Sequence, residues 1–178
     1  MKLVKPFVFL ALIIALVFVL APASEAKGPK GPNLVDVALI VNGPGSPYEG
    51  QFDTLIAAVL AADPAVVATL TGNGQHTVFA PTDDAFAELG LNPDNVDDAL
   101  SQDALTQILL YHVANGRRDS GDVVSSSQIR TLQRGFFQVD GTILTDNLDR
   151  DAKIIVTDVP AANGLIHAID AVLLPFAP

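Results

Sequence analysis

The sequence predicts an α+β domain in which several helices pack against a largely antiparallel sheet. Apolar residues recur at helical spacing through the first half of the chain, and short β-rich runs separated by turns dominate the second half. Helices in one block and strands in another are typical of α+β folds, whereas an alternating order would predict a parallel βαβ sheet. No internal repeat of roughly 20–50 residues is present, so one domain is expected.

Residues 1–26 are predicted to be an export signal rather than part of the fold. Lys2 and Lys5 precede an unbroken apolar run, and small residues follow it. This order is that of a secretory signal peptide, and the run is shorter than the roughly 20 residues of a membrane-spanning helix. Cleavage is expected after Ala23 or after Ala26, and an uncleaved membrane anchor is the alternative.

The mature chain is expected to consist of a flexible leader, residues 27–32, and one domain over residues 33–178. The chain has no cysteine, which excludes disulfides, thiolate metal sites and a lipid anchor on cysteine. Its formal net charge of −10 disfavours nucleic acid and anionic lipid as partners. After cleavage we expect no stable membrane insertion and a secreted, extracellular or periplasmic location.

Five helices are expected in the first half of the chain. Their apolar positions recur at helical spacing, and four of them follow a residue that can cap a helix. The first is expected to begin after Asn33, the second to span 52–60 and the third to begin after Asp63. The fourth is expected over 83–89, after Thr82, and the fifth begins after Ser101 and ends at Tyr111-His112. The helix over 52–60 is the clearest, because Phe52, Leu55, Ile56, Val59 and Leu60 form one apolar stripe.

Strands are expected at one place in the first half and throughout the second half. Thr77–Ala80 is typical of a buried strand that a proline ends. Asp140-Gly141 between two β-rich runs predicts a hairpin with a type I′ turn. Asn163-Gly164 predicts another turn. The remaining strands are expected at 137–139, 143–145, 154–159 and 165–174.

Three segments together resemble the motifs of the fasciclin domain family. They are residues 77–86 (TVFAPTDDAF), 109–113 (LLYHV) and 163–175 (NGLIHAIDAVLLP), in the family's order, and the similarity extends over about residues 33–175. The resemblance implies a wedge of β-strands in two sheets, antiparallel or mixed, with several helices packed around it. This architecture agrees with the order of elements predicted above.

The resemblance implies a function in adhesion, through binding to a protein or polysaccharide of a cell surface or extracellular matrix. Some members of the family bind lipids or integrins. The alternative is a secreted or periplasmic carrier of a lipid or another apolar ligand, which the single soluble copy and the 49% hydrophobic composition favour. An enzyme is not expected, since the sequence has no nucleophile elbow, phosphate loop or dinucleotide fingerprint. No cofactor is expected either.

Four motif residues are candidate partner contacts, with a structural role as the alternative. They are Tyr111, His112, His167 and Asp170. The resemblance links the Tyr-His pair to adhesion, whereas the apolar neighbours of both histidines predict buried, hydrogen-bonded imidazoles. The other motif residues are expected to be structural, with both phenylalanines in the core and the second threonine as a helix cap: Thr77, Phe79, Pro81, Thr82, Phe86, Gly164 and Pro175.

No metal site is expected. His76, His112 and His167 lack the close spacing of zinc ligands, and His76 lies in a polar stretch that predicts an exposed side chain. The acidic segments 146–151 and 94–98 do not match a calcium-binding loop and are expected to be solvated loops.

Overall fold

A mixed seven-stranded sheet carries the fold of residues 31–176, which this computed structural model describes. The strands are β1 His76–Pro81, β2 Val113–Asn115, β3 Gln128–Arg130, β4 Phe136–Asp140, β5 Ile143–Thr145, β6 Asp151–Ala161 and β7 Gly164–Ile169. They are ordered β2-β1-β7-β6-β5-β4-β3 across the sheet. The predicted signal peptide, both cleavage sites and most of the leader lie outside the described residues.

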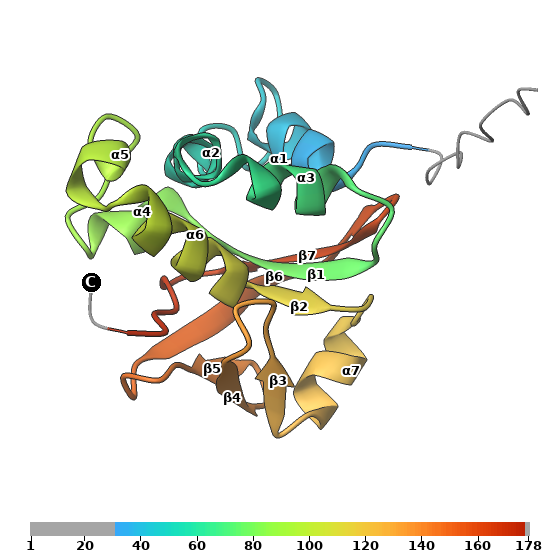
Figure 1. Ribbon diagram of the computed structural model, residues 1–178. Coiled ribbons are helices and arrows are strands. Elements are labelled where there is room, and N and C mark those ends of the chain that lie inside the picture. The colour runs from blue at the N-terminus through green and yellow to red at the C-terminus, as the bar shows by residue number, and fades with distance from the viewer. Residues whose placement is uncertain (1–30, 177–178) are drawn as a thin grey trace, which may run out of the picture.

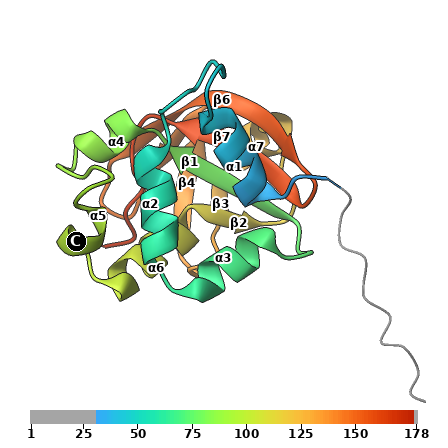
Figure 2. The same cartoon turned by 90° about the horizontal axis from the view of Figure 1, so that it is seen from above.

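Most helices cover one face of the sheet and one of its ends, and the last helix packs on the other side beside β4 (Figure 1). Within residues 31–176 they are α1 Leu34–Asn42, α2 Asp53–Ala61, α3 Pro64–Thr71, α4 Asp83–Ala87, α5 Val96–Ala99, α6 Gln102–Tyr111 and α7 Ser120–Ser125. Helices α1, α2 and α3 form a layer above β1, β6 and β7, and we call them the helical layer. Figure 2 shows this layer from above, with α1 over β6 and β7, which it contacts.

The helix starts expected from the sequence are present. Asn33, Asp63, Thr82 and Ser101 each accept a hydrogen bond from a backbone N–H in the first turn of the following helix. Pro64 occupies the first position of α3, where a missing N–H costs nothing. Short polar side chains therefore fix where four of the helices begin.

The α+β class is confirmed, and one strand pair departs from the antiparallel expectation. Strands β1 and β7 are parallel, with His76 opposite Gly164, whereas the other neighbouring strands in the sheet are antiparallel. Parallel pairing needs a long connection, and most of the domain lies between these two strands. The strand expected over 165–174 ends at Ile169.

Two local predictions in the second half were wrong. Helix α7 lies where strands were expected, because its six residues are too few to show helical periodicity, although Asp119 caps it. The hairpin of β4 and β5 forms, but Asp140 pairs with Ile143, so Gly141 and Thr142 are the turn residues. Of these two, Gly141 alone has a positive φ, 59°, which is the pattern of a type II′ turn rather than type I′.

Two hydrophobic cores lie on opposite faces of the β1-β7-β6 region. Because strand side chains alternate, Val78 and Ala80 point toward the helical layer and Phe79 points to the other side. There Phe79 meets Phe137 edge-on, with ring centroids 5.1 Å apart, and Phe137 meets Tyr111. This region of the sheet is therefore covered on both faces.

Candidate functional site

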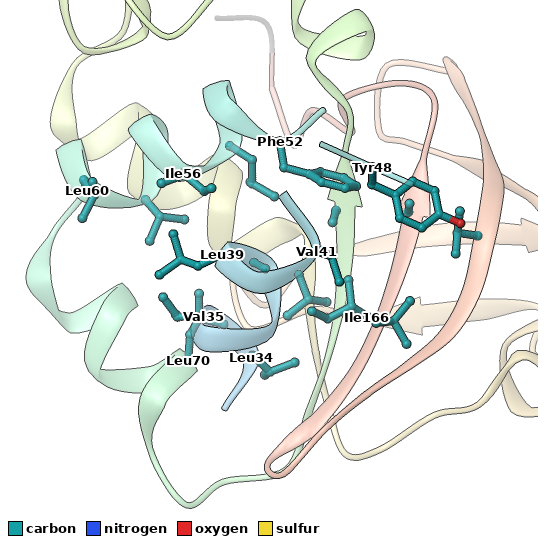
Figure 3. A pocket seen from close by; sticks show the side chains of 18 residues that line it. Leu34, Val35, Leu39, Val41, Tyr48, Phe52, Ile56, Leu60, Leu70 and Ile166 are labelled. Carbon is teal, nitrogen blue, oxygen red and sulfur yellow. The ribbon is translucent and has the colours of Figure 1, made fainter. Parts of the chain in front are cut away.

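An apolar groove lies between the helical layer and the sheet (Figure 3). Its volume is about 200 Å³. Among its eighteen lining side chains, only Tyr48 carries a polar group. We call this site the α1–α2 groove, and its lining is Leu34, Val35, Ala38, Leu39, Val41, Tyr48, Phe52, Leu55, Ile56, Val59, Leu60, Leu70, Val78, Ala80, Val156, Val159, Ile166 and Ala168.

Helices α1 and α2 carry apolar side chains that the core does not bury. Phe52 and Leu55 are buried in the core, whereas Leu60, from the same predicted stripe, is 76% exposed. On α1, Leu39 is 50% exposed. Both exposed leucines also line the groove, so its apolar interior continues onto the surface.

A β-bulge in β6 shapes the floor of the groove. Val156 and Val159 both line the groove, although residues three apart in a regular strand face opposite sides. The pairing of β6 with β7 shifts register between these two valines, which turns both toward the helices. Asp158 within the bulge has φ 61°, a left-handed conformation that aspartate tolerates better than most residues.

His167, on the opposite face of β7, holds this bulge in place through a hydrogen bond. Its imidazole is fully buried, and its Nδ1 accepts the backbone N–H of Asp158 at 3.2 Å. With Nδ1 as acceptor, Nε2 carries the proton and donates to the carbonyl of Arg118 at 3.0 Å. Hydrogen bonds from Ser120, with His167 nearby, lower the pKa of the Asp158 carboxyl. His167 therefore positions the floor of the groove without lining it.

Asn163 fastens the helical layer to the sheet, a role that the sequence did not reveal. Its side chain is 1% exposed and accepts the N–H of Leu34 at 2.9 Å. Its amide donates to the carbonyls of Leu70 and Gly72 at 2.7 and 2.8 Å. One side chain thus ties together the start of α1 and the end of α3. The sequence predicted only that Asn163 lies in a turn.

Gly164 lies where no side chain fits. A Cβ at this position would collide with the carbonyl oxygen of His76, its partner on β1. The expectation that His76 is exposed is wrong, because it begins β1 between two neighbouring strands and is 8% exposed. Burial lowers the pKa of His76.

Tyr111 and His112 lie inside the domain at the end of α6. The Tyr111 hydroxyl donates to the carbonyl of Phe136, and burial raises its pKa to about 12. The His112 Nδ1 lies 2.8 Å from the carbonyl of Ile108, and its Nε2 accepts the N–H of Leu173 at 2.9 Å. Burial lowers the pKa of His112 to about 4, so the imidazole is neutral at pH 7.

Asp146 corrects the expectation that its acidic segment is a solvated loop. It is 5% exposed and forms a salt bridge of 2.7 Å with Arg150. It also accepts the backbone N–H of Leu148 and of Leu174. Burial alone would raise the pKa of Asp146, but the hydrogen bonds from Leu174 and Arg150 outweigh it and lower the pKa. Asp146 thus anchors the segment that follows β7.

Three of the four candidate partner contacts are buried. Tyr111 and His167 are fully buried and His112 is 3% exposed. Asp170 is exposed, and its carboxylate accepts the N–H of Lys153 at 2.7 Å. A partner contact at these positions stays a prediction, and the contacts described here support structural roles.

The remaining motif residues also make internal contacts. The hydroxyl of Thr77 donates to the carbonyl of Gly116 and accepts the N–H of Arg118, both at 2.8 Å. Phe79 and Phe86 belong to the two cores. Pro81, Thr82 and Gly164 are buried, and Pro175 is half-buried.

A second apolar cavity, of about 290 Å³, lies between core side chains on the other side of α2. Its lining includes Phe86 and Leu105, both buried. None of the exposed large apolar side chains within residues 31–176 borders this cavity. It therefore lacks the exposed apolar edge of the α1–α2 groove.

Residues 31–176 contain no group of three or more histidine, aspartate or glutamate side chains that could hold a metal ion. No single helix there is long and apolar enough to cross a membrane; α2 and α3 taken together have the length and composition, but they meet at 116°.

Comparisons with known proteins give a family and several relatives. A family model described as "Fasciclin domain" matches residues 50–175. "Protein sll1483" of Synechocystis is 41% identical over 131 residues, covering 70% of this chain and 67% of that protein. "Cell surface glycolipoprotein MPB83" of Mycobacterium bovis is 33% identical over 158 residues, covering 84% and 68%.

A solved structure shares the fold. A domain pair from the insect cell adhesion molecule Fasciclin I matches with a TM-score of 0.52 and 23% identity. The match covers 65% of this chain and 42% of that one. At this identity the likeness shows the fold alone, and it confirms the α+β fold class expected from the sequence. The strands form one seven-stranded sheet rather than the two sheets that the resemblance implied.

Proposed function

The chain belongs to the fasciclin domain family, and from this premise we propose that it is an exported, non-catalytic binding module of the cell surface or extracellular matrix. Two proteins similar to it are named as a cell surface glycolipoprotein and a cell adhesion molecule. The predicted signal peptide over residues 1–26 supports export. Among the motif residues, Tyr111, His112 and His167 are buried and hydrogen-bonded inside the fold, which directs attention to another binding surface.

One observation carries the proposal: the α1–α2 groove offers an apolar interior that opens onto exposed leucines. Ligand sites are typically concave and apolar with few polar groups, and Tyr48 supplies the one polar group here. An engineered cavity of roughly 150 Å³ binds benzene, so about 200 Å³ accommodates a somewhat larger apolar group. In this proposal the groove takes an apolar group of a surface or matrix partner.

A carrier of a lipid or another apolar small ligand is the second candidate, and the same groove favours it. Each methylene buried from water contributes about 0.8 kcal/mol, so roughly six give about 5 kcal/mol, a sub-millimolar affinity before other costs. A tightly held ligand would therefore have to extend along the apolar surface beyond the groove.

The test compares two alanines of the helical layer. Ala38 lines the groove and Ala68 is exposed on α3 outside it, so Ala38→Phe fills the groove and Ala68→Phe is the matched control. We expect saturable retention of the mature protein on the cell-surface or matrix fraction of its own cells. Ala38→Phe should lose this retention, and Ala68→Phe should keep it.

Solvent extraction of the freshly purified protein separates the two candidates. A stoichiometric lipid that Ala38→Phe lacks would favour the carrier. A clean extract together with saturable retention would favour the surface module. Equal retention of both variants would contradict a role for the groove, and absence of retention together with a clean extract would contradict both candidates.

A further inference from the structure

We propose that the rim of the α1–α2 groove docks on an uncharged lipid surface, from which an apolar ligand enters the groove. We define the rim as Leu39, Ile40 and Leu60. This inference rests on the carrier, the second candidate of the proposed function, because it names the surface at which the groove is filled. Three exposed aliphatic side chains and the charge of the surrounding helices support it.

The rim concentrates exposed apolar surface next to an apolar interior. Leu39, Ile40 and Leu60 are 50%, 63% and 76% exposed. Figure 3 shows Leu39 on α1 and Leu60 on α2, and both also line the groove. The other exposed large apolar side chains of residues 31–176 lie singly on other elements: Val124, Phe136, Leu148 and Ile155. Isolated exposed residues are ordinary, whereas an apolar patch that continues into a pocket indicates a binding surface.

The charge around the rim selects among possible surfaces. From Gly31 to Gly116 the sequence contains no lysine or arginine, and this segment includes α1 through α6. Asp36 and Asp53 lie on the helices of the layer, and Glu49 and Asp63 lie in the connections between them. Anionic lipid would be repelled by such a face. A second copy of the chain would bring two acidic faces together, which is disfavoured for the same reason.

An uncharged lipid surface matches both the exposed aliphatic rim and the acidic helices around it. It accepts aliphatic side chains and repels no carboxylate. The attachment of amphipathic helices to membranes scales with buried apolar area and gains from basic residues, and α1, α2 and α3 carry none. Docking is therefore expected to be weak and reversible, as suits a domain that must leave the surface after its groove is filled.

Vesicle flotation of the mature protein tests the inference. We expect the protein to bind phosphatidylcholine vesicles equally at low and high salt, and less when anionic phosphatidylglycerol is added at low salt. Ile40 does not line the groove, so Ile40→Gln removes rim surface alone. It should weaken vesicle binding roughly ten-fold, because most of an isoleucine side chain no longer enters the lipid. Val124→Gln, on α7, is the matched control and should bind as the wild type does.

The outcomes separate this inference from the proposed function. Ile40→Gln should still bind the apolar fluorescent probe phenylnaphthylamine in solution, because the groove itself is intact. Absence of vesicle binding with normal probe binding would overturn the docking surface and leave the groove function standing. Loss of vesicle binding at high salt would indicate attraction by charge and would also overturn it. Self-association that Ile40→Gln abolishes would assign the rim to a second copy instead.

Discussion

Replacing His112 with alanine is expected to destabilise the domain by about 3–7 kcal/mol. The imidazole is 3% exposed, so its removal leaves a cavity comparable to that of a large apolar side chain, which costs about 2–4 kcal/mol. The N–H of Leu173 loses its acceptor, which costs about 1–3 kcal/mol. The carbonyl of Ile108 still accepts the backbone N–H of residue 112 and adds little. This loss is a large part of the stability of a typical domain.

Urea unfolding at pH 7.5, followed by circular dichroism, measures the change directly. Asp170→Asn is the control, because Asp170 is exposed and its amide replacement keeps an acceptor for the N–H of Lys153. A destabilisation below about 1 kcal/mol in His112→Ala, accompanied by lost retention on cells or matrix, would refute the reasoning. It would mean that the imidazole acts on a partner rather than on the fold.

Three further perturbations follow from the same contacts. The folded protein should lose about 3 kcal/mol of stability as the pH falls from about 6.5 to about 4, because the unfolded state protonates His112 at its ordinary pKa of 6.5 and the folded state only near 4. Urea titrations over this range should show a slope that is clearly smaller in His112→Ala, where His76 with its lowered pKa still contributes, and a flat profile in the wild type would contradict it. Asn163→Ala should lower the free energy of unfolding by about 2–4 kcal/mol and weaken probe binding in the groove, because α1 and α3 lose their shared hydrogen-bonding partner on the sheet. An unchanged melting temperature in calorimetry would count against this. Gly164→Ala should cost more than about 3 kcal/mol, since its Cβ meets the His76 carbonyl, and a soluble, normally melting variant would disprove the collision.

Local chemistry explains why much of the fold was predictable. The caps at Asn33, Asp63 and Ser101 act within a few residues of themselves, so a short stretch of sequence contains the whole signal. The hairpin of β4 and β5 is also local, and its error was one residue in the turn. The family resemblance then supplied the arrangement of these elements.

The groove was not predictable, because it depends on contacts between distant segments. Asn163 binds carbonyl and N–H groups 93 and 129 positions away. The bulge that turns Val159 toward the helices depends on His167. The alternation of side chains along the strand predicted that His167 is buried, but it could not predict the hydrogen bond from the N–H of Asp158. His76 and Asp146 have polar sequence neighbours, yet strand pairing and a salt bridge bury them. Periodicity located the apolar stripe of α2 and could not show that Leu60 stays exposed.

Titration of phenylnaphthylamine into the mature wild type, Ala38→Phe and Ala68→Phe tests the central claim most directly. A groove with an apolar lining should take up the probe at one saturable site in the wild type and in Ala68→Phe. Ala38→Phe, with a ring filling that space, should bind at least roughly ten-fold more weakly at unchanged melting temperature. Equal binding by all three proteins, or no saturable binding by the wild type, would contradict the assignment of the α1–α2 groove as the binding site.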